Sequence, residues 1–324
     1  MSAMSRLVSN TIANMLTFSE HGFATHFIPA RRIPMLLDRL AELDQPHASV
    51  IDRTIEDFSA ERASDEPPAP FTGAKRSALD SAFRHSTVEQ IIKDLESFAQ
   101  TSVDASVRQW ASDTLAMLHM RSPTSLKVAL KAIRRGKRLT LLETLDMELK
   151  IATAFCVSFF FLKYCRIVLD LFIQSGASPD FITGVKAVIV DRTKERPNWS
   201  PASLNDVSAQ IVANFFDPKS PYLSSAPEIA NPAELTSGTK LNPMKYALPS
   251  EEEIGSVVTG SHASGGGVGI RFDELLKRFA ELRPGKLGVK EKVYEVVQRR
   301  CEVTDNGDGN RVWLKWKHLP KERI

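Results

Sequence analysis

The chain has 324 residues, of which 43% are hydrophobic and 25% are charged, with 42 basic side chains against 39 acidic ones. This composition is typical of a globular protein that buries a core. It argues against three classes: the net charge of +3 is small for a nucleic-acid binder, three cysteines cannot form a disulfide framework, and no apolar run is long enough to span a membrane. Residues 1–20 carry no secretory signal or transit peptide.

Helices are predicted for most of residues 31–218. Apolar residues between Ile33 and Leu43 recur at the spacing of one helical face, and a proline-rich stretch over 65–73 predicts a loop. Ser86 and Glu89 have the spacing of a capping box at the start of the next helix.

A helical hairpin is predicted over residues 122–156. Ser122 suits an N-cap, Pro123 suits the first helical position, and Gly136 is placed to end that helix in a left-handed turn. Thr140 and Glu143 form a second capping box. The apolar face expected for the second helix consists of Leu141, Leu145, Leu149, Ala152 and Phe155.

Several stretches together resemble a known family. They are residues 21–28 (HGFATHFI), 122–127 (SPTSLK), the pair Met147 and Glu148, and 180–188 (DFITGVKAV) continued through Pro197, Trp199 and Pro201. In this order they are similar to the 3-hydroxyisobutyryl-CoA hydrolase family of the crotonase, or enoyl-CoA hydratase/isomerase, superfamily. The resemblance implies a mainly α chain: residues 21–218 correspond to the helical C-terminal half of a crotonase-like α/β fold.

The resemblance also implies an activity, which is thioester hydrolysis in valine breakdown, and a mitochondrial location. The substrate is an acyl-CoA, and no separate cofactor is implied because CoA is part of that substrate. The reaction needs an oxyanion loop and a carboxylate, which the family carries upstream of this half. Neither precedes His21, so we predict no catalytic residue here and an inactive chain. The Gly-rich stretch His262 to Gly269 is interpreted as a flexible linker.

Two residues are candidates for binding CoA. By resemblance to hydratases of the superfamily, Arg192 or Lys194 is expected near the phosphates of CoA, with a solvated charge before the Pro197 turn as the alternative. The seven histidines show no metal-ligand spacing, so no metal site is predicted, and His26 is interpreted as structural.

Two segments do not fit the family. Residues 157–174 form an apolar insertion, in which thirteen of 18 residues are apolar, and residues 1–20 precede the resemblance. The insertion could extend the previous helix in a buried position. Alternatively, because Val-Ser and Gln are what in-frame splice donors and acceptors encode, residues 8–20 and 157–174 are interpreted as translated introns.

The region after residue 218 has a different character. Prolines, serines and glycines predict a linker over 219–270. Residues 271–324 predict a small α+β helix-helix-hairpin domain, similar to a winged helix, and carry 14 Lys or Arg against 9 Asp or Glu. Trp313 and Trp316 alternate with lysines, which suits either packing in a small core or contact with RNA.

These features leave two functions open. The first is the hydrolase of the family resemblance. The alternative is a noncatalytic component of the mitochondrial small ribosomal subunit, because fungal relatives of the family resemble one, and the basic tail would then meet RNA or the ribosome. No membrane partner is expected.

Overall fold

The computed structural model describes residues 21–44, 47–60, 71–156, 176–229, 244–264, 269–305 and 312–317. Within these ranges the chain is divided into two units. Unit 1 lies within Asp80–Lys240, and unit 2 combines Ser9–Leu79 with Leu241–Ile324. The segments interpreted as introns, residues 8–20 and 157–174, lie outside the described residues.

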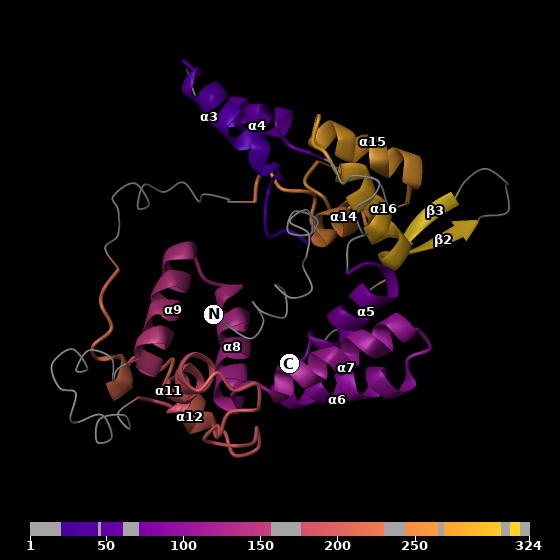
Figure 1. Cartoon of the computed structure of the whole chain (residues 1–324). Coiled ribbons are helices and arrows are strands. Elements are labelled where there is room, and N and C mark those ends of the chain that lie inside the picture. The colour runs from indigo at the N-terminus through magenta and orange to yellow at the C-terminus, as the bar shows by residue number, and fades with distance from the viewer. Residues whose placement is uncertain are drawn as a thin grey trace. The chain divides into compact units, whose positions relative to one another are not determined.

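Unit 1 is built from helices (Figure 1). The four long ones are α6 (Val88–Thr101), α7 (Ala105–His119), α8 (Pro123–Gly136) and α9 (Leu141–Cys156). Shorter elements follow, namely α11 (Asp180–Val185), the π-helix η4 (Lys186–Val190), α12 (Ala209–Ala213) and the 3-10 helix η5 (Pro221–Leu223). Helices α6 and α7 lie side by side, as do α8 and α9 (Figure 1).

The predicted helix starts in unit 1 are mostly confirmed. Ser122 caps α8 by accepting from the Ser125 N–H at 2.9 Å, and Pro123 stands at the first helical position. The Thr140–Glu143 capping box is present, since Glu143 Oε2 accepts from the Thr140 N–H at 2.7 Å. For α6 the cap is Thr87 and not Ser86, because Thr87 has the extended backbone and accepts from the Gln90 N–H.

Two local predictions in unit 1 are wrong. Gly136 does not adopt a left-handed conformation, because α8 is followed by Lys137 in right-handed geometry. The buried face of α9 runs through Met147 and Ala154, while Leu141 and Leu145 are exposed; of the face that was expected, Phe155 does pack against the core. The packing partners decide this face: the core of unit 1 gathers Met147 and Ala154 with residues of α8, α12 and the loops around them, including Val128, Val207, Val212, Phe215, Phe216 and Leu223.

Unit 2 combines both ends of the chain. Its N-terminal part contains α3 (Ile33–Ala41) after the 3-10 turn η1 (Ala30–Arg32), then α4 (Ala48–Asp57) and α5 (Gly73–Ala82), which runs across the boundary into unit 1. Its C-terminal part contains α14 (Glu251–Val258), β1 (Ile270–Arg271), α15 (Phe272–Leu282), α16 (Val289–Arg300), β2 (Cys301–Asp305) and β3 (Val312–Trp316). The strands form an antiparallel sheet in the order β1-β3-β2.

Helix α14 lies inside the stretch expected to be a linker. Ser250 caps it by accepting from the Glu253 N–H at 3.0 Å, and Ile254 is fully buried in the core of unit 2. Gly255 lies directly against the indole of Trp316, where a Cβ would come within 2.8 Å of the ring. The region between residues 219 and 270 therefore contributes a core helix. The flanking prolines and glycines concealed this short amphipathic segment in the sequence.

The division into units differs from the expected domains. The expectation placed residues 21–218 in one body, whereas the contacts place residues 21–79 with the C-terminal region. Unit 2 buries Leu275, Phe279, Val293 and Val296 completely, and Trp316 packs against this cluster. Among the described residues, no helix is both long and apolar enough to cross a membrane.

Candidate functional site

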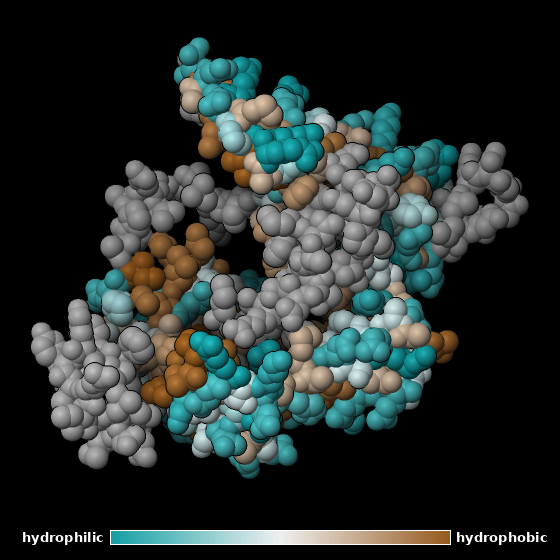
Figure 2. Space-filling model, in the orientation of Figure 1, coloured by the Kyte–Doolittle hydropathy of each residue, from teal (hydrophilic) through white to brown (hydrophobic). Residues whose placement is uncertain are grey.

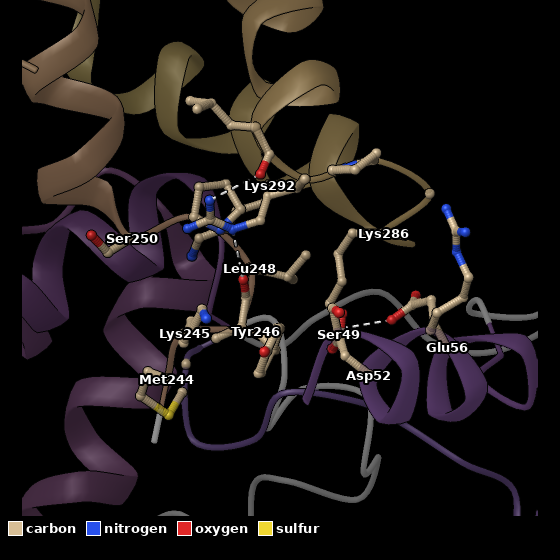
Figure 3. A pocket seen from close by; sticks show the side chains of 18 of the residues that line it. Ser49, Asp52, Glu56, Met244, Lys245, Tyr246, Leu248, Ser250, Lys286 and Lys292 are labelled. Carbon is tan, nitrogen blue, oxygen red and sulfur yellow. Dashed lines mark hydrogen bonds and ion pairs between the residues drawn. The ribbon is translucent and has the colours of Figure 1, made fainter. Parts of the chain in front are cut away.

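An open cleft of about 1350 Å³ lies in unit 2. Helix α4 and the segment Met244–Ser250 line it together with the turn between α15 and α16 and with α16 itself. Figure 3 shows this cleft, with Ser49, Asp52 and Glu56 on α4 and with Lys286 and Lys292 contributed by the C-terminal region.

Glu56 joins the two parts of unit 2 at this cleft. Its carboxylate accepts from Lys286 Nζ at 2.6 Å and from the Leu287 N–H at 2.8 Å. His26 Nε2 lies 3.2 Å from the same carboxylate and 3.1 Å from Asp52 Oδ1. Burial alone would raise the pKa of Glu56, but these contacts from His26, Lys286 and Leu287 outweigh it and lower the pKa to about 2.

The backbone around α4 is fixed by neighbouring residues of the N-terminal part. Arg32 Nη1 donates to the carbonyls of Phe58 and Ser59, at 3.2 and 2.7 Å, and so covers the C-terminal end of the helix. The Ala60 N–H donates to the Phe27 carbonyl at 3.0 Å. Together these bonds hold Glu56 toward the C-terminal region.

The other acidic residues of the cleft are also engaged. Arg283 Nη2 makes a two-oxygen contact with Glu253 at 3.0 and 3.1 Å. Glu251 contacts Arg299, and it lies 2.7 Å from Arg300 Nε. Because Glu251 is in the first turn of α14 and the two arginines are in the last turn of α16, each charge also suits the dipole of its own helix.

Positive charge gathers at one end of the cleft. Arg76 Nη1 of α5 lies 3.3 Å from His21 Nδ1, and Lys292 of α16 lines the same wall. Burial lowers the pKa of His21 to about 4, helped by the positive charges of Arg76, Lys292 and Arg299. Burial and Arg76 likewise lower the pKa of Lys292.

The basic tail is therefore not a continuous free surface. Arg283, Lys286, Arg299 and Arg300 use their charges within unit 2. Arg300 also lies over the ring of Trp316, 5.2 Å from its centroid. Of the two interpretations of the C-terminal tryptophans, these contacts favour packing for Trp316. In the described part of the chain, no group of three His, Cys, Asp or Glu is placed to hold a metal ion.

The two residues predicted near CoA lie in unit 1, outside this cleft. Arg192 has a positive φ of 50° at the end of η4, and both Arg192 and Lys194 are exposed. The turn that follows is well held, because Arg196 donates to the carbonyls of His119 and Ala202 at 2.8 and 2.7 Å. The sequence did not predict that His21, Glu56, Arg76 and Lys292 would line one cleft. Sequence patterns extend over a few residues, whereas Lys292 lies more than 200 positions after the other three.

An apolar surface is also present in unit 1. Val188, Ile189 and Val190 of η4 are exposed, as are Leu141 and Leu145 at the start of α9. Figure 2 shows hydrophobic residues gathered at the surface where Figure 1 places α9 and α11. Exposed apolar clusters of this kind are typical of contact surfaces.

Comparisons with known proteins give the chain a family and two kinds of relative. It is 30% identical over 306 residues to the small ribosomal subunit protein mS47 of Neurospora crassa, which covers 91% of this chain and 53% of that protein. It is also 30% identical over 201 residues to mS47 of Schizosaccharomyces pombe, covering 62% of this chain and 41% of the relative. The mitochondrial 3-hydroxyisobutyryl-CoA hydrolase-like protein 1 of Arabidopsis thaliana is 34% identical over 216 residues, covering 66% of this chain and 46% of the relative.

The chain thus spans about half the length of the curated relatives it matches. The family model described as enoyl-CoA hydratase/isomerase matches residues 11–216. This range begins before His21. Residues 11–20 therefore fall within the family match, although they were expected to lie outside it. This match covers more than half of the chain. The chain therefore belongs to the enoyl-CoA hydratase/isomerase family.

Proposed function

We propose that this protein is a structural component of the mitochondrial small ribosomal subunit. One observation carries the proposal: similarity to mS47 of Neurospora crassa covers 91% of the chain and must therefore extend well beyond residue 218. The hydrolase-like relative covers 66%, a share close to that of the family match at residues 11–216. The C-terminal region is thus included in the match to mS47 of Neurospora crassa, whereas mS47 of Schizosaccharomyces pombe matches over 62% of the chain.

The organisation of unit 2 supports this proposal. The C-terminal region has a hydrophobic core of its own and is joined to residues 21–60 by the contacts of Glu56 with Lys286 and the Leu287 N–H, so it is connected to the family-matched segment. Its order of elements, helix, strand, two helices and a hairpin, is similar to that of a winged helix, a relative of the helix-turn-helix modules that bind nucleic acid.

Sedimentation of the tagged protein, expressed from its own gene, tests the proposal. We expect it in the small-subunit fractions of a mitochondrial lysate on a sucrose gradient, with release as the salt concentration rises. Recovery only in the light fractions at low salt would contradict the proposal. A matrix enzyme of unrelated function serves as the control for trapping.

A second candidate is hydrolysis of 3-hydroxyisobutyryl-CoA, supported by the 34% identity to the plant hydrolase-like protein. In that case Arg192 and Lys194 are our candidates for contact with the phosphates of CoA, and both are exposed enough to reach a ligand. Thioester release by the purified protein, with 3-hydroxyisobutyryl-CoA as substrate, separates the candidates. Release above background that is weakened in Arg192→Met and Lys194→Met would favour the enzyme.

A further inference from the structure

The turn between α8 and α9 in unit 1 carries a concentration of positive charge. Residues 131–143 contain five basic side chains and one carboxylate, that of Glu143. The five cations are all exposed, and together they are called the basic turn: Lys131, Arg134, Arg135, Lys137 and Arg138. Lys131, Arg134 and Arg135 are spaced by three and four residues, so they lie on one face at the end of α8 (Figure 1).

Ion pairs among the described residues do not balance this charge. Those found in unit 1 join other side chains, namely Lys127 with Glu89, Lys150 with Asp146 and His85 with Asp94. Glu143 contributes one negative charge, on a carboxylate that accepts from the N–H and the hydroxyl of Thr140. The dipole of α8 adds about half a negative charge at this end of the helix. Glu143 and the dipole together therefore offset less than half of the charge of the basic turn.

Contacts with the rest of unit 1 hold three of the cations in place. Lys131 Nζ lies 4.8 Å and Arg135 Cζ 5.5 Å from the centroid of the Phe216 ring, which belongs to the core of this unit. Arg134 Nη2 donates to the carbonyls of Phe83 and His85. Because the partners are a ring and two carbonyl groups, these contacts position the cations without neutralising them.

The tip of the basic turn is free to meet a partner. Within the described residues, the side chains of Lys137 and Arg138 form no hydrogen bond or ion pair, and both are exposed. The surface thus combines three positioned cations along the end of α8 with two more at the tip.

The composition of the basic turn favours phosphate groups. Three of its five residues are arginines, whose guanidinium groups bind phosphate through two parallel hydrogen bonds, and lysine binds phosphate as a point charge. Clustered lysine and arginine on one face are the electrostatic footprint of nucleic-acid binding, whereas interfaces between proteins are depleted of lysine. A nucleic-acid backbone therefore fits this surface better than an acidic protein does.

We propose that the basic turn of unit 1 binds the phosphate backbone of RNA. Lys137 and Arg138 contact phosphates at the tip, and the cations at the end of α8 contact the neighbouring ones. This inference rests on the proposed ribosomal function, from which it takes RNA as the nucleic acid. Contacts to phosphates carry no base information, so binding through this surface is independent of RNA sequence.

Binding of two short fluorescein-labelled RNAs of unrelated sequence to the purified full-length protein tests the site. Anisotropy is measured between about 50 and 200 mM KCl. We expect the double variant Lys137→Gln with Arg138→Gln to bind both RNAs about tenfold more weakly, and the slope of log K against log salt to fall by about two. The matched control is Lys93→Gln with Lys219→Gln, which removes two positive charges from exposed positions of unit 1 outside the basic turn.

Unchanged RNA binding by the double variant would overturn the proposal, as would an equal loss in the control. A second double variant, Lys137→Arg with Arg138→Lys, keeps both charges and should bind RNA as the original protein does. A loss as large as that of the glutamine variant would contradict binding through charge. Labelled poly-L-glutamate is the probe for an acidic protein: binding tighter than that of RNA, with the same loss in the glutamine variant, would overturn the assignment to RNA.

The sedimentation experiment keeps this inference separate from the proposed function. Sedimentation of the protein with small subunits, combined with normal RNA binding by the glutamine variant, would overturn the role of the basic turn and leave the ribosomal function standing. RNA binding that depends on the basic turn, in a protein that never sediments with small subunits, would overturn the ribosomal function and support the basic turn as an RNA site.

Discussion

Unit 1 and unit 2 are assembled in different ways. Unit 1 is a succession of helices whose neighbours in sequence are neighbours in space, such as α6 with α7 and α8 with α9. Unit 2 joins segments separated by more than 200 residues, and a partly buried carboxylate, that of Glu56, connects them. Short-range sequence patterns therefore define much of unit 1, whereas unit 2 depends on ion pairs between residues that are far apart in the sequence.

The largest expected effect is on the stability of unit 2, and it tests whether this unit unfolds cooperatively. Phe279→Ala removes a fully buried ring from its core and should cost about 3–5 kcal/mol of stability. Because residues 21–60 share this unit, their amides should lose protection in hydrogen exchange together with those of 269–305. Loss confined to the C-terminal residues would show that the N-terminal segment is held independently. Phe215→Ala, in unit 1, is the matched control.

Breaking the ion pair between Glu56 and Lys286 should have the second largest effect on stability. Glu56→Gln leaves Lys286, whose side chain is 7% exposed, without its carboxylate, and we expect a loss of about 2–4 kcal/mol in chemical denaturation. The control is Glu42→Gln, which breaks the ion pair with Arg39 at side chains that are 65% and 60% exposed. That change should cost less than about 0.5 kcal/mol. Equal effects of the two variants would contradict the role given to Glu56.

The third effect is on pH dependence. The pKa of His21 is lowered to about 4 in the folded protein, by burial and by Arg76 of α5 with Lys292 and Arg299 of α16. The unfolded state therefore binds more protons between pH 6.5 and 4, so stability should fall as the pH is lowered through that window, by about 1–3 kcal/mol. His21→Asn should flatten this part of the profile. The lowered pKa of Glu56 acts at lower pH, where stability is lost as pH falls from about 4.5 toward 2.

The smallest effect concerns a helix cap in unit 1. Thr87→Ala removes the hydroxyl that accepts from the Gln90 N–H and should cost about 1 kcal/mol. Ser86→Ala, at the position that the sequence pattern favoured, should change stability by less than about 0.5 kcal/mol. Thermal unfolding of the two variants would distinguish them, and a reversed order would place the cap at Ser86.

Much of unit 1 could be predicted because its signals are local. Ser122, Pro123, Thr140 and Glu143 act on backbone groups within three or four residues of themselves, and the structure has all four in the predicted roles. The buried face of α9 could not be predicted, since it depends on Phe215 and Leu223, which come much later in the chain. Helix α14 was missed for the same reason: its burial depends on Trp316.

The candidate site in unit 2 illustrates the limit most directly. Lys286 and Glu56 are unremarkable charges in the sequence, one in a basic tail and one on a predicted helix face. Their pairing over 230 positions requires the N-terminal segment to pack on the C-terminal region. The CoA contacts of Arg192 and Lys194 stay predictions, and both residues are exposed in unit 1.

The sequence by itself determined the family, the helical character of the body and the positions of most helix starts, because capping and periodicity act over a few residues. The tertiary structure alone decided that residues 21–79 belong with the C-terminal region, that the basic tail balances much of its charge internally, and that His21, Arg76 and Lys292 line one cleft. The physical reason is that burial and Coulomb energy depend on distances in space, which composition and spacing along the chain do not contain.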